Sequence, residues 1–116
     1  MKHLIFLIFL FSGLLSFVYA DSDDVKSDAE EAYSYSKKGI NADDLEEVQD
    51  YAKKAMSAAE DAQSEADDCN LDEAASHAEE AYSFAKKAYR SDDFEEAINF
   101  LKKAKNAADD TISACD

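Results

Sequence analysis

The sequence predicts an all-α protein in which four antiparallel helices form two duplicated helical hairpins. The 116 residues include no proline and only two glycines, and alanine, glutamate and lysine, which favour helices, are abundant after residue 20. The pattern EE-[AV]-x-x-[YF]-x-KK occurs four times, beginning at Glu30, Glu46, Glu79 and Glu95. A shift of 49 positions aligns residues 29–66 with 78–115, and 19 of these 38 pairs are identical, which indicates an internal duplication.

Residues 1–20 are expected to be a cleaved signal peptide. A short basic start, Met1-Lys2-His3, precedes an apolar run over 4–15, and Ala20 stands directly before an abruptly acidic segment. The apolar run is shorter than the roughly 20 residues that a spanning helix needs, although an uncleaved anchor is the alternative. We therefore expect an exported protein, periplasmic or secreted, that is not inserted in a membrane after cleavage.

The spacing of capping residues predicts where each helix begins. Four pairs fit the capping-box spacing: Ser27 with Glu30, Asp43 with Glu46, Asn70 with Glu73, and Asp92 with Glu95. They predict helices over about 27–40, 44–67, 71–90 and 93–114. Hairpin 1 then covers about 27–67 and hairpin 2 about 71–114, within one domain spanning 21–116. The links contain only a few residues, so successive helices should lie antiparallel as neighbours.

Small apolar residues recur in steps of three and four, which predicts the buried face of the helices. Alanine dominates these seams, so the helix axes should approach closely. One aromatic residue of each repeated pattern flanks a seam, namely Tyr35, Tyr51, Phe84 and Phe100. The predicted seams are Leu45, Val48, Ala52, Ala55, Ala59, Ala62 and Ala66; Leu71, Ala74, Ala78, Ala81, Ala85 and Ala88; and Phe94, Ala97, Leu101, Ala104, Ala108 and Ile112.

The charge limits the classes of partner. After residue 20 the chain has 11 lysine and arginine residues against 27 acidic residues, a net charge of −16. Nucleic acid and anionic membrane surfaces are therefore not expected partners, because both need basic patches. The Glu-Glu and Lys-Lys pairs themselves are interpreted as solvated helix faces.

Residues 81–104 resemble a tetratricopeptide repeat, particularly in the segment Asp92-Asp93-Phe94-Glu95-Glu96-Ala97-Ile98-Asn99-Phe100-Leu101-Lys102-Lys103-Ala104. The family's small, large and alanine positions of the second helix fall on Ala97, Leu101 and Ala104. Phe84 and Ala85 stand where the first helix usually has leucine and glycine. The first hairpin has Tyr35, Ser36, Val48, Ala52 and Ala55 at those places. The chain departs from the family in lacking the closing proline and in its spacing of 49 residues rather than about 34.

This resemblance implies a concave groove that binds a protein or peptide, and we expect Tyr33, Tyr82 and Tyr89 to line it. With only two hairpins, a closed four-helix bundle is the alternative arrangement. In that bundle the small residues form the core, whereas in the repeat arrangement one apolar face stays open.

Cys69 and Cys115 are the only cysteines. In an up-down-up-down arrangement both lie at the same end, because each ends a helix that runs in the same direction. An intramolecular disulfide is therefore expected in an exported chain, with free thiols or an intermolecular bond as alternatives.

No residue group predicts catalysis or a cofactor. His77, with Glu73 and Glu80 one turn away on either side, is interpreted as an exposed helix histidine rather than a metal ligand. The paired aspartates near helix ends are interpreted as caps, since no twelve-residue calcium loop is present. Nucleophile, phosphate-binding and haem signatures are also missing from the sequence, so we expect no enzyme activity, no metal and no cofactor.

Two functions remain. The first is a small exported acidic helical-repeat protein that serves as a protein- or peptide-interaction module. The alternative is a solute-facing protein whose acidic or alanine-rich surface binds cations or contacts ice.

Overall fold

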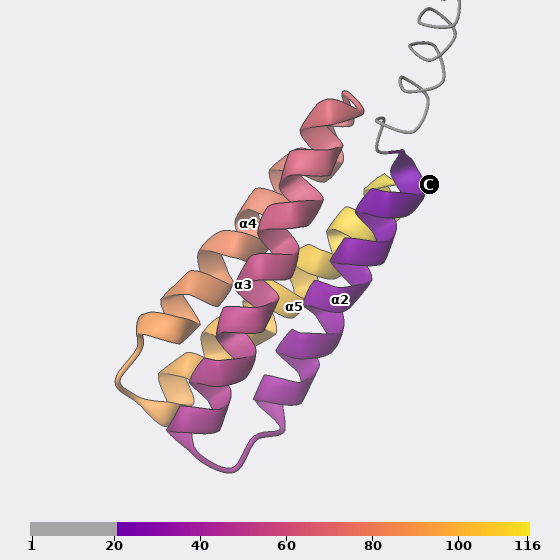
Figure 1. Cartoon of the computed structure of the whole chain (residues 1–116). Coiled ribbons are helices and arrows are strands. Elements are labelled where there is room, and N and C mark those ends of the chain that lie inside the picture. The colour runs from indigo at the N-terminus through magenta and orange to yellow at the C-terminus, as the bar shows by residue number, and fades with distance from the viewer. Residues whose placement is uncertain (1–20) are drawn as a thin grey trace, which may run out of the picture.

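The computed structural model describes residues 21–116 as four helices, with no strand among them. The helices are α2 (Ser22–Ile40), α3 (Leu45–Asp68), α4 (Asp72–Arg90) and α5 (Phe94–Ala114), and successive helices run in opposite directions (Figure 1). The predicted all-α fold is confirmed. The expected signal peptide, residues 1–20, lies outside the described residues.

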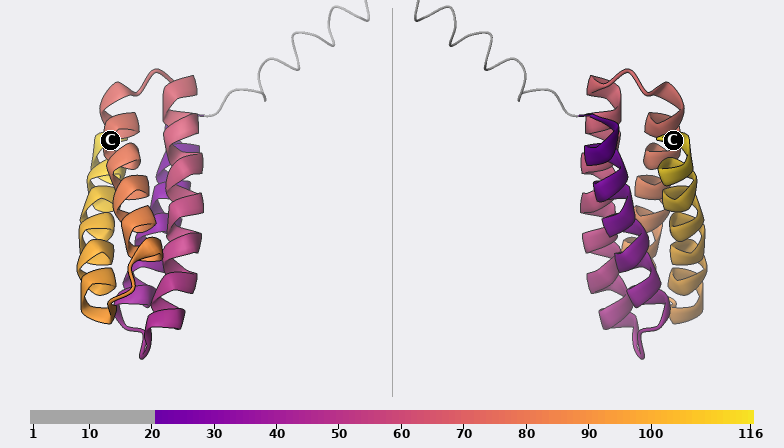
Figure 2. Two further views of the ribbon diagram at one scale, coloured as in Figure 1. Left: turned by 90° about the vertical axis from the view of Figure 1, so that its left-hand side faces the viewer. Right: turned by 90° about the vertical axis from the view of Figure 1, so that its right-hand side faces the viewer.

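The four helices close into a ring. Each helix packs against the next along the chain, and α2 also packs along α5, so that both hairpins lie side by side (Figure 2). The pairs α2 with α4 and α3 with α5 are therefore the two diagonals of the bundle. Of the two arrangements that the sequence allowed, the closed four-helix bundle describes the structure.

The observed helix starts differ from the predicted ones, three of them by a single residue. The first helix begins at Ser22 rather than near residue 27, because Asp21 and Asp24 form a capping box that the sequence interpretation overlooked. The second and fourth helices are capped by Asp44 and Asp93, each one residue after the aspartate that was predicted.

The third helix begins after Leu71, which makes no side-chain capping bond. The predicted cap, Asn70, instead ends the preceding helix in the left-handed conformation, with φ 60°. The amide of Leu71 donates to the carbonyl of Ala66 at 2.8 Å, and the amide of Asn70 donates to that of Asp67 at 3.2 Å. This is a Schellman motif, which asparagine can form because its short polar side chain tolerates positive φ.

The core is a stack of three layers of small side chains. The layer nearest the α2–α3 and α4–α5 turns contains Val48 and Leu101 among its alanines, together with flanking aromatic rings. A middle layer consists of alanines alone, and the layer nearest the α3–α4 turn adds only Val25 to them. The predicted seams are therefore largely confirmed, except that Phe94 at the start of its helix is exposed and Leu45, Leu71 and Ile112 are half-buried.

Alanine packing leaves almost no free space at the centre. The narrow gap there does not admit a water molecule, and its lining is Ala29, Ala32, Ala59, Ala62, Ala78, Ala81, Ala108 and Thr111. Close approach of the helix axes thus replaces large side chains as the means of excluding water.

Candidate functional site

The bundle separates charge along its long axis. We divide it at the middle alanine layer into an acidic half, residues 21–31, 60–80 and 106–116, and a mixed half, residues 32–59 and 81–105. The acidic half has 18 acidic residues and a single lysine, a net charge of −17. The mixed half has 9 acidic and 10 basic residues, so it is nearly neutral.

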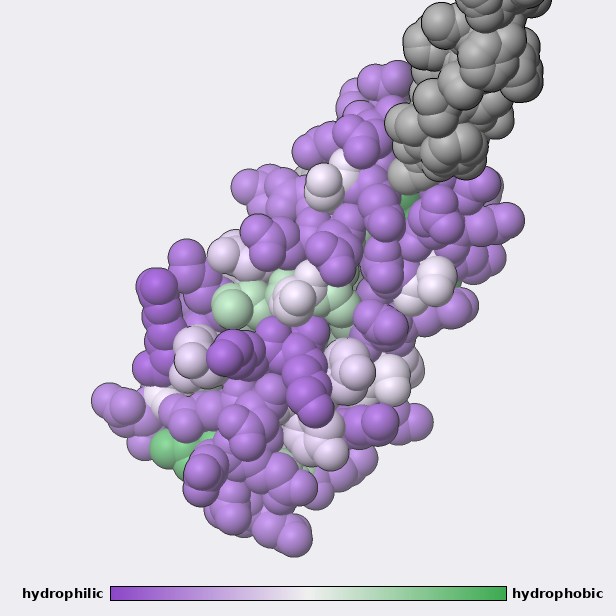
Figure 3. Space-filling model, viewed as in Figure 1, coloured by the Kyte–Doolittle hydropathy of each residue, from purple (hydrophilic) through white to green (hydrophobic). Residues whose placement is uncertain are grey.

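This polarity arises because the antiparallel helices bring together segments that are distant in the sequence. The acidic first halves of α2 and α4 lie beside the acidic last halves of α3 and α5. Figure 3 shows this end, around the α3–α4 turn, as mainly hydrophilic, like most of the rest of the same face. The arrangement creates a strongly negative potential at one end of the molecule, which would attract cationic groups.

Glu65 lies where this negative charge is most crowded. One of its carboxyl oxygens is buried and has no hydrogen-bond partner within the described part of the chain. Burial, a carboxyl–carboxylate hydrogen bond with Asp28 and the charges of Asp24 and Asp61 raise the pKa of Glu65 to about 8. The Glu65 carboxyl group therefore keeps its proton near neutral pH, which removes one charge from the α2–α3 interface.

Lysines cover aromatic rings in the mixed half. Lys54 lies over the rings of both Tyr35 and Tyr51, which stack with centroids 6.5 Å apart. In the second hairpin Lys87, the counterpart of Lys38, lies over the rings of Phe84 and Phe100. The counterpart of Lys54 is Lys103, which lies over the Phe84 ring. We call these two groups the lysine–aromatic clusters. The lysines are thus not merely solvated flanks, because their ammonium groups shield apolar rings from water.

The sequence contained a signal for these clusters. The second lysine of every pair follows an aromatic residue by three positions, which places the two side chains on the same helix face. The contacts that cross between helices, such as Lys54 over the Tyr35 ring, could not be derived from that spacing.

The three groove candidates do not lie together. Tyr33 and Tyr82 are half-buried against the middle alanine layer, but they belong to α2 and α4, a diagonal pair of the ring. Lys105 of α5 lies over the Tyr33 ring, and Lys86 lies over the Tyr82 ring. Tyr89, two turns beyond Tyr82, is 38% exposed. The structure therefore does not place these tyrosines in one groove, and their role in binding stays a prediction.

His77 lines a shallow, mostly acidic depression between α4 and α5. Its Nδ1 lies 3.5 Å from a carboxylate oxygen of Glu80, which is too long for a strong hydrogen bond. The lining residues are Glu73, His77, Asp110, Ser113, Ala114 and Asp116. Nowhere in residues 21–116 are three or more histidine, cysteine or acidic side chains arranged to hold a metal ion.

Cys69 and Cys115 lie at the same end of the bundle, as expected from the helix directions. They cap the C-terminal ends of α3 and α5, and both pack against the core layer that contains Val25. Burial raises the pKa of each thiol, and nearby acidic side chains raise it further.

No protein-family model, curated protein or solved structure matches the chain. Within residues 21–116, none of the helices has the length and apolar character needed to cross a membrane.

Proposed function

We propose that this protein is an exported interaction module that binds a cationic protein or peptide through its acidic half. The observation that supports the proposal is the separation of charge, with −17 in one half and near neutrality in the other. Such a field accelerates the encounter with a positively charged partner and orients it toward one end of the bundle.

The chemistry of this surface fits binding rather than catalysis. Its carboxylates are spread over four helices and most are exposed, so they can accept hydrogen bonds from several lysine or arginine side chains at once. A flexible basic peptide could follow these carboxylates without any deep pocket. The ten basic residues of the mixed half balance its nine acidic residues, which confines the attraction to one end.

Cation binding by the same carboxylates is the alternative function. The ice-contacting version of that alternative gains no support from the fold, because it needs a flat, exposed face of small residues. Every alanine after residue 20 is buried except Ala42 and Ala114, which are half-buried.

The repeated Glu-Glu pairs offer a matched test. Two pairs, Glu30-Glu31 and Glu79-Glu80, lie in the acidic half, and two others, Glu46-Glu47 and Glu95-Glu96, lie in the mixed half. Replacing either set with glutamine changes the net charge equally. Each variant is titrated by calorimetry with a short oligolysine peptide at low and at physiological salt, and circular dichroism checks that both remain folded.

We expect the acidic-half variant to lose about tenfold in affinity at low salt, and the mixed-half variant to lose less than about threefold. Wild-type affinity should fall as salt rises, because the ions screen the field. Equal losses in both variants would contradict the proposed surface. Saturable calcium binding without peptide binding would instead support the cation-binding alternative.

A further inference from the structure

We propose that Cys69 and Cys115 form an intramolecular disulfide that ties the C-terminal end of α3 to the C-terminal end of α5. These two helices are a diagonal pair of the ring, so the bond crosses the end of the bundle rather than joining neighbours. The inference is independent of the proposed function, because it concerns what holds the acidic half together.

Both cysteines are held in place by the fold. Each follows the last turn of its helix, and both side chains pack against the same core layer, which includes Val25, Ala66 and Ala74. Both cysteines lie against this one layer, although the structure itself does not join them by a disulfide. They are the only cysteines in the chain, so a bond within one molecule has a single possible pairing.

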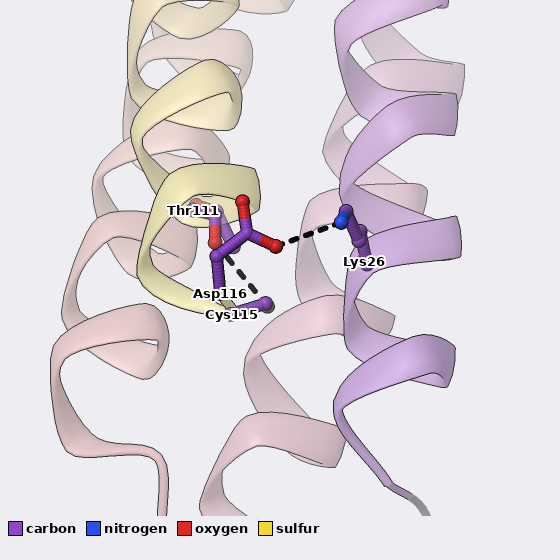
Figure 4. A network of polar contacts seen from close by, with 4 residues as sticks. All are labelled: Lys26, Thr111, Cys115 and Asp116. Carbon is purple, nitrogen blue, oxygen red and sulfur yellow. Dashed lines mark hydrogen bonds and ion pairs between the residues drawn. The ribbon is translucent and has the colours of Figure 1, made fainter.

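The C-terminal end of α5 makes one hydrogen bond within its own last turn and one with α2 (Figure 4). The Cys115 thiol donates to the carbonyl oxygen of Thr111 at 3.3 Å. The next residue, Asp116, accepts a hydrogen bond from Lys26 Nζ of α2 at 2.8 Å. These contacts hold Cys115 next to the core layer that contains Val25.

The acidic half is expected to be the less stable half of the bundle without a crosslink. Its core layer contains Val25 but otherwise only alanines as buried residues, whereas the opposite layer contains Leu101 and the flanking aromatic rings. The same half carries nearly all of the unbalanced negative charge, which opposes close packing. A disulfide that closes a long loop constrains the unfolded chain and offsets both disadvantages.

The reaction is a thiol–disulfide exchange with a small-molecule disulfide or the disulfide of an oxidoreductase in the exporting compartment. One cysteine thiolate attacks that disulfide and releases the first thiol, and the second cysteine then displaces the other. The two cysteines lose two electrons and two protons, and the oxidant is reduced to two thiols. Because both cysteine pKa values are raised, the folded, reduced protein should oxidise faster as pH increases.

The test uses the full chain, expressed for export and purified without reductant, then incubated with oxidised glutathione. We expect a monomer that takes up no alkylating reagent until it is reduced, and a proteolytic peptide that joins the segments around Cys69 and Cys115. Reduction should lower the midpoint of thermal unfolding by at least about 10 °C.

Cys69→Ser and Cys115→Ser provide the controls, and alkylated wild type provides a reduced form that needs no substitution. Each should unfold at the midpoint of reduced wild type, with or without reductant. Alkylation of both thiols in the oxidised sample, or a disulfide-linked dimer, would overturn the inference. So would a thermal midpoint that does not respond to reductant.

Discussion

At the scale of single residues, Ser36 is one of the few polar side chains buried among the alanines of the core. Its hydroxyl has no hydrogen-bond partner within residues 21–116, whereas the buried Thr111 hydroxyl donates to the carbonyl of Ala107 at 2.9 Å. The duplicated hairpin has Ala85 at the position equivalent to Ser36. An unsatisfied buried polar group typically costs about 1–3 kcal/mol.

We therefore expect Ser36→Ala to raise the free energy of unfolding by about 1 kcal/mol. Urea denaturation followed by circular dichroism measures the change. The reciprocal variant, Ala85→Ser, is the matched control and should lose stability. A less stable Ser36→Ala protein would show that the hydroxyl has a partner that matters.

Glu65 gives the molecule a specific dependence on pH. Its pKa is about 8 in the folded state and about 4.3 in an unfolded chain, so folding favours the protonated form. The stabilisation from this proton is complete below the unfolded pKa and is lost as pH rises toward 8. Burial is the largest cause of the raised pKa, followed by the hydrogen bond with Asp28 and by the charges of Asp24 and Asp28 on α2 and Asp61 on its own helix.

Glu65→Gln should mimic the protonated form. We expect this variant to match wild type near pH 4.5 and to be more stable by about 1 kcal/mol at pH 8, a value discounted for partial exposure of the side chain. Urea denaturation at both pH values measures the difference between the two proteins. A difference that is the same at both pH values would rule out titration of this carboxyl group as its source.

At the scale of helices, Gly39 and Leu101 show how α2 and α5 fit together. A Cβ atom on Gly39 would overlap Cδ1 of the buried Leu101 and lie 3.1 Å from Cβ of Tyr51. The equivalent pair in the duplicated frame is Ala88 with Ala52, so a glycine opposite a leucine replaces two alanines. The glycine–leucine pair has a larger total side-chain volume than the two alanines, so the two hairpins pack these equivalent positions differently.

The effect of Gly39→Ala on the free energy of unfolding should depend on the residue at position 101. In wild type we expect it to destabilise by about 1–3 kcal/mol through overpacking. In a Leu101→Ala background it should destabilise less, because the overlap with Leu101 is gone and only the close contact with Cβ of Tyr51 remains. Unfolding free energies of the four proteins form a double-mutant cycle, and purely additive effects would refute the proposed contact.

Helix ends were harder to predict than helix existence, and the reason is chemical. Asp43-Asp44 and Asp92-Asp93 each offer two neighbouring side chains that can cap, and only the backbone conformation selects the second of each pair. Asn70 can cap either a helix start or a helix end, and the close turn between α3 and α4 selects the left-handed role.

At the scale of the whole molecule, repulsion within the acidic half should make stability depend on salt. Sodium chloride screens exposed like charges, so raising it from low to physiological ionic strength should increase the thermal midpoint. We expect the glutamine variant of Glu30, Glu31, Glu79 and Glu80 to gain stability at low salt and to respond less to added salt. The matched variant of the mixed-half glutamates is the control, and an identical salt response would contradict uneven repulsion.

The sequence by itself determined the helices, the alanine seams and the excess of acidic residues. These follow from propensity, from a period of three and four residues and from composition, all of which are local properties. It also determined that Cys69 and Cys115 lie at one end, because short links leave successive helices antiparallel.

Only the tertiary structure decided that α2 packs along α5 and closes the ring, which places Tyr33 and Tyr82 on diagonal helices rather than in one groove. It also laid lysines across aromatic rings of neighbouring helices. Both features depend on which helices become neighbours and on how far each helix is shifted along the bundle axis. That choice depends on how well the side-chain volumes of distant segments fit together, and no local pattern encodes it.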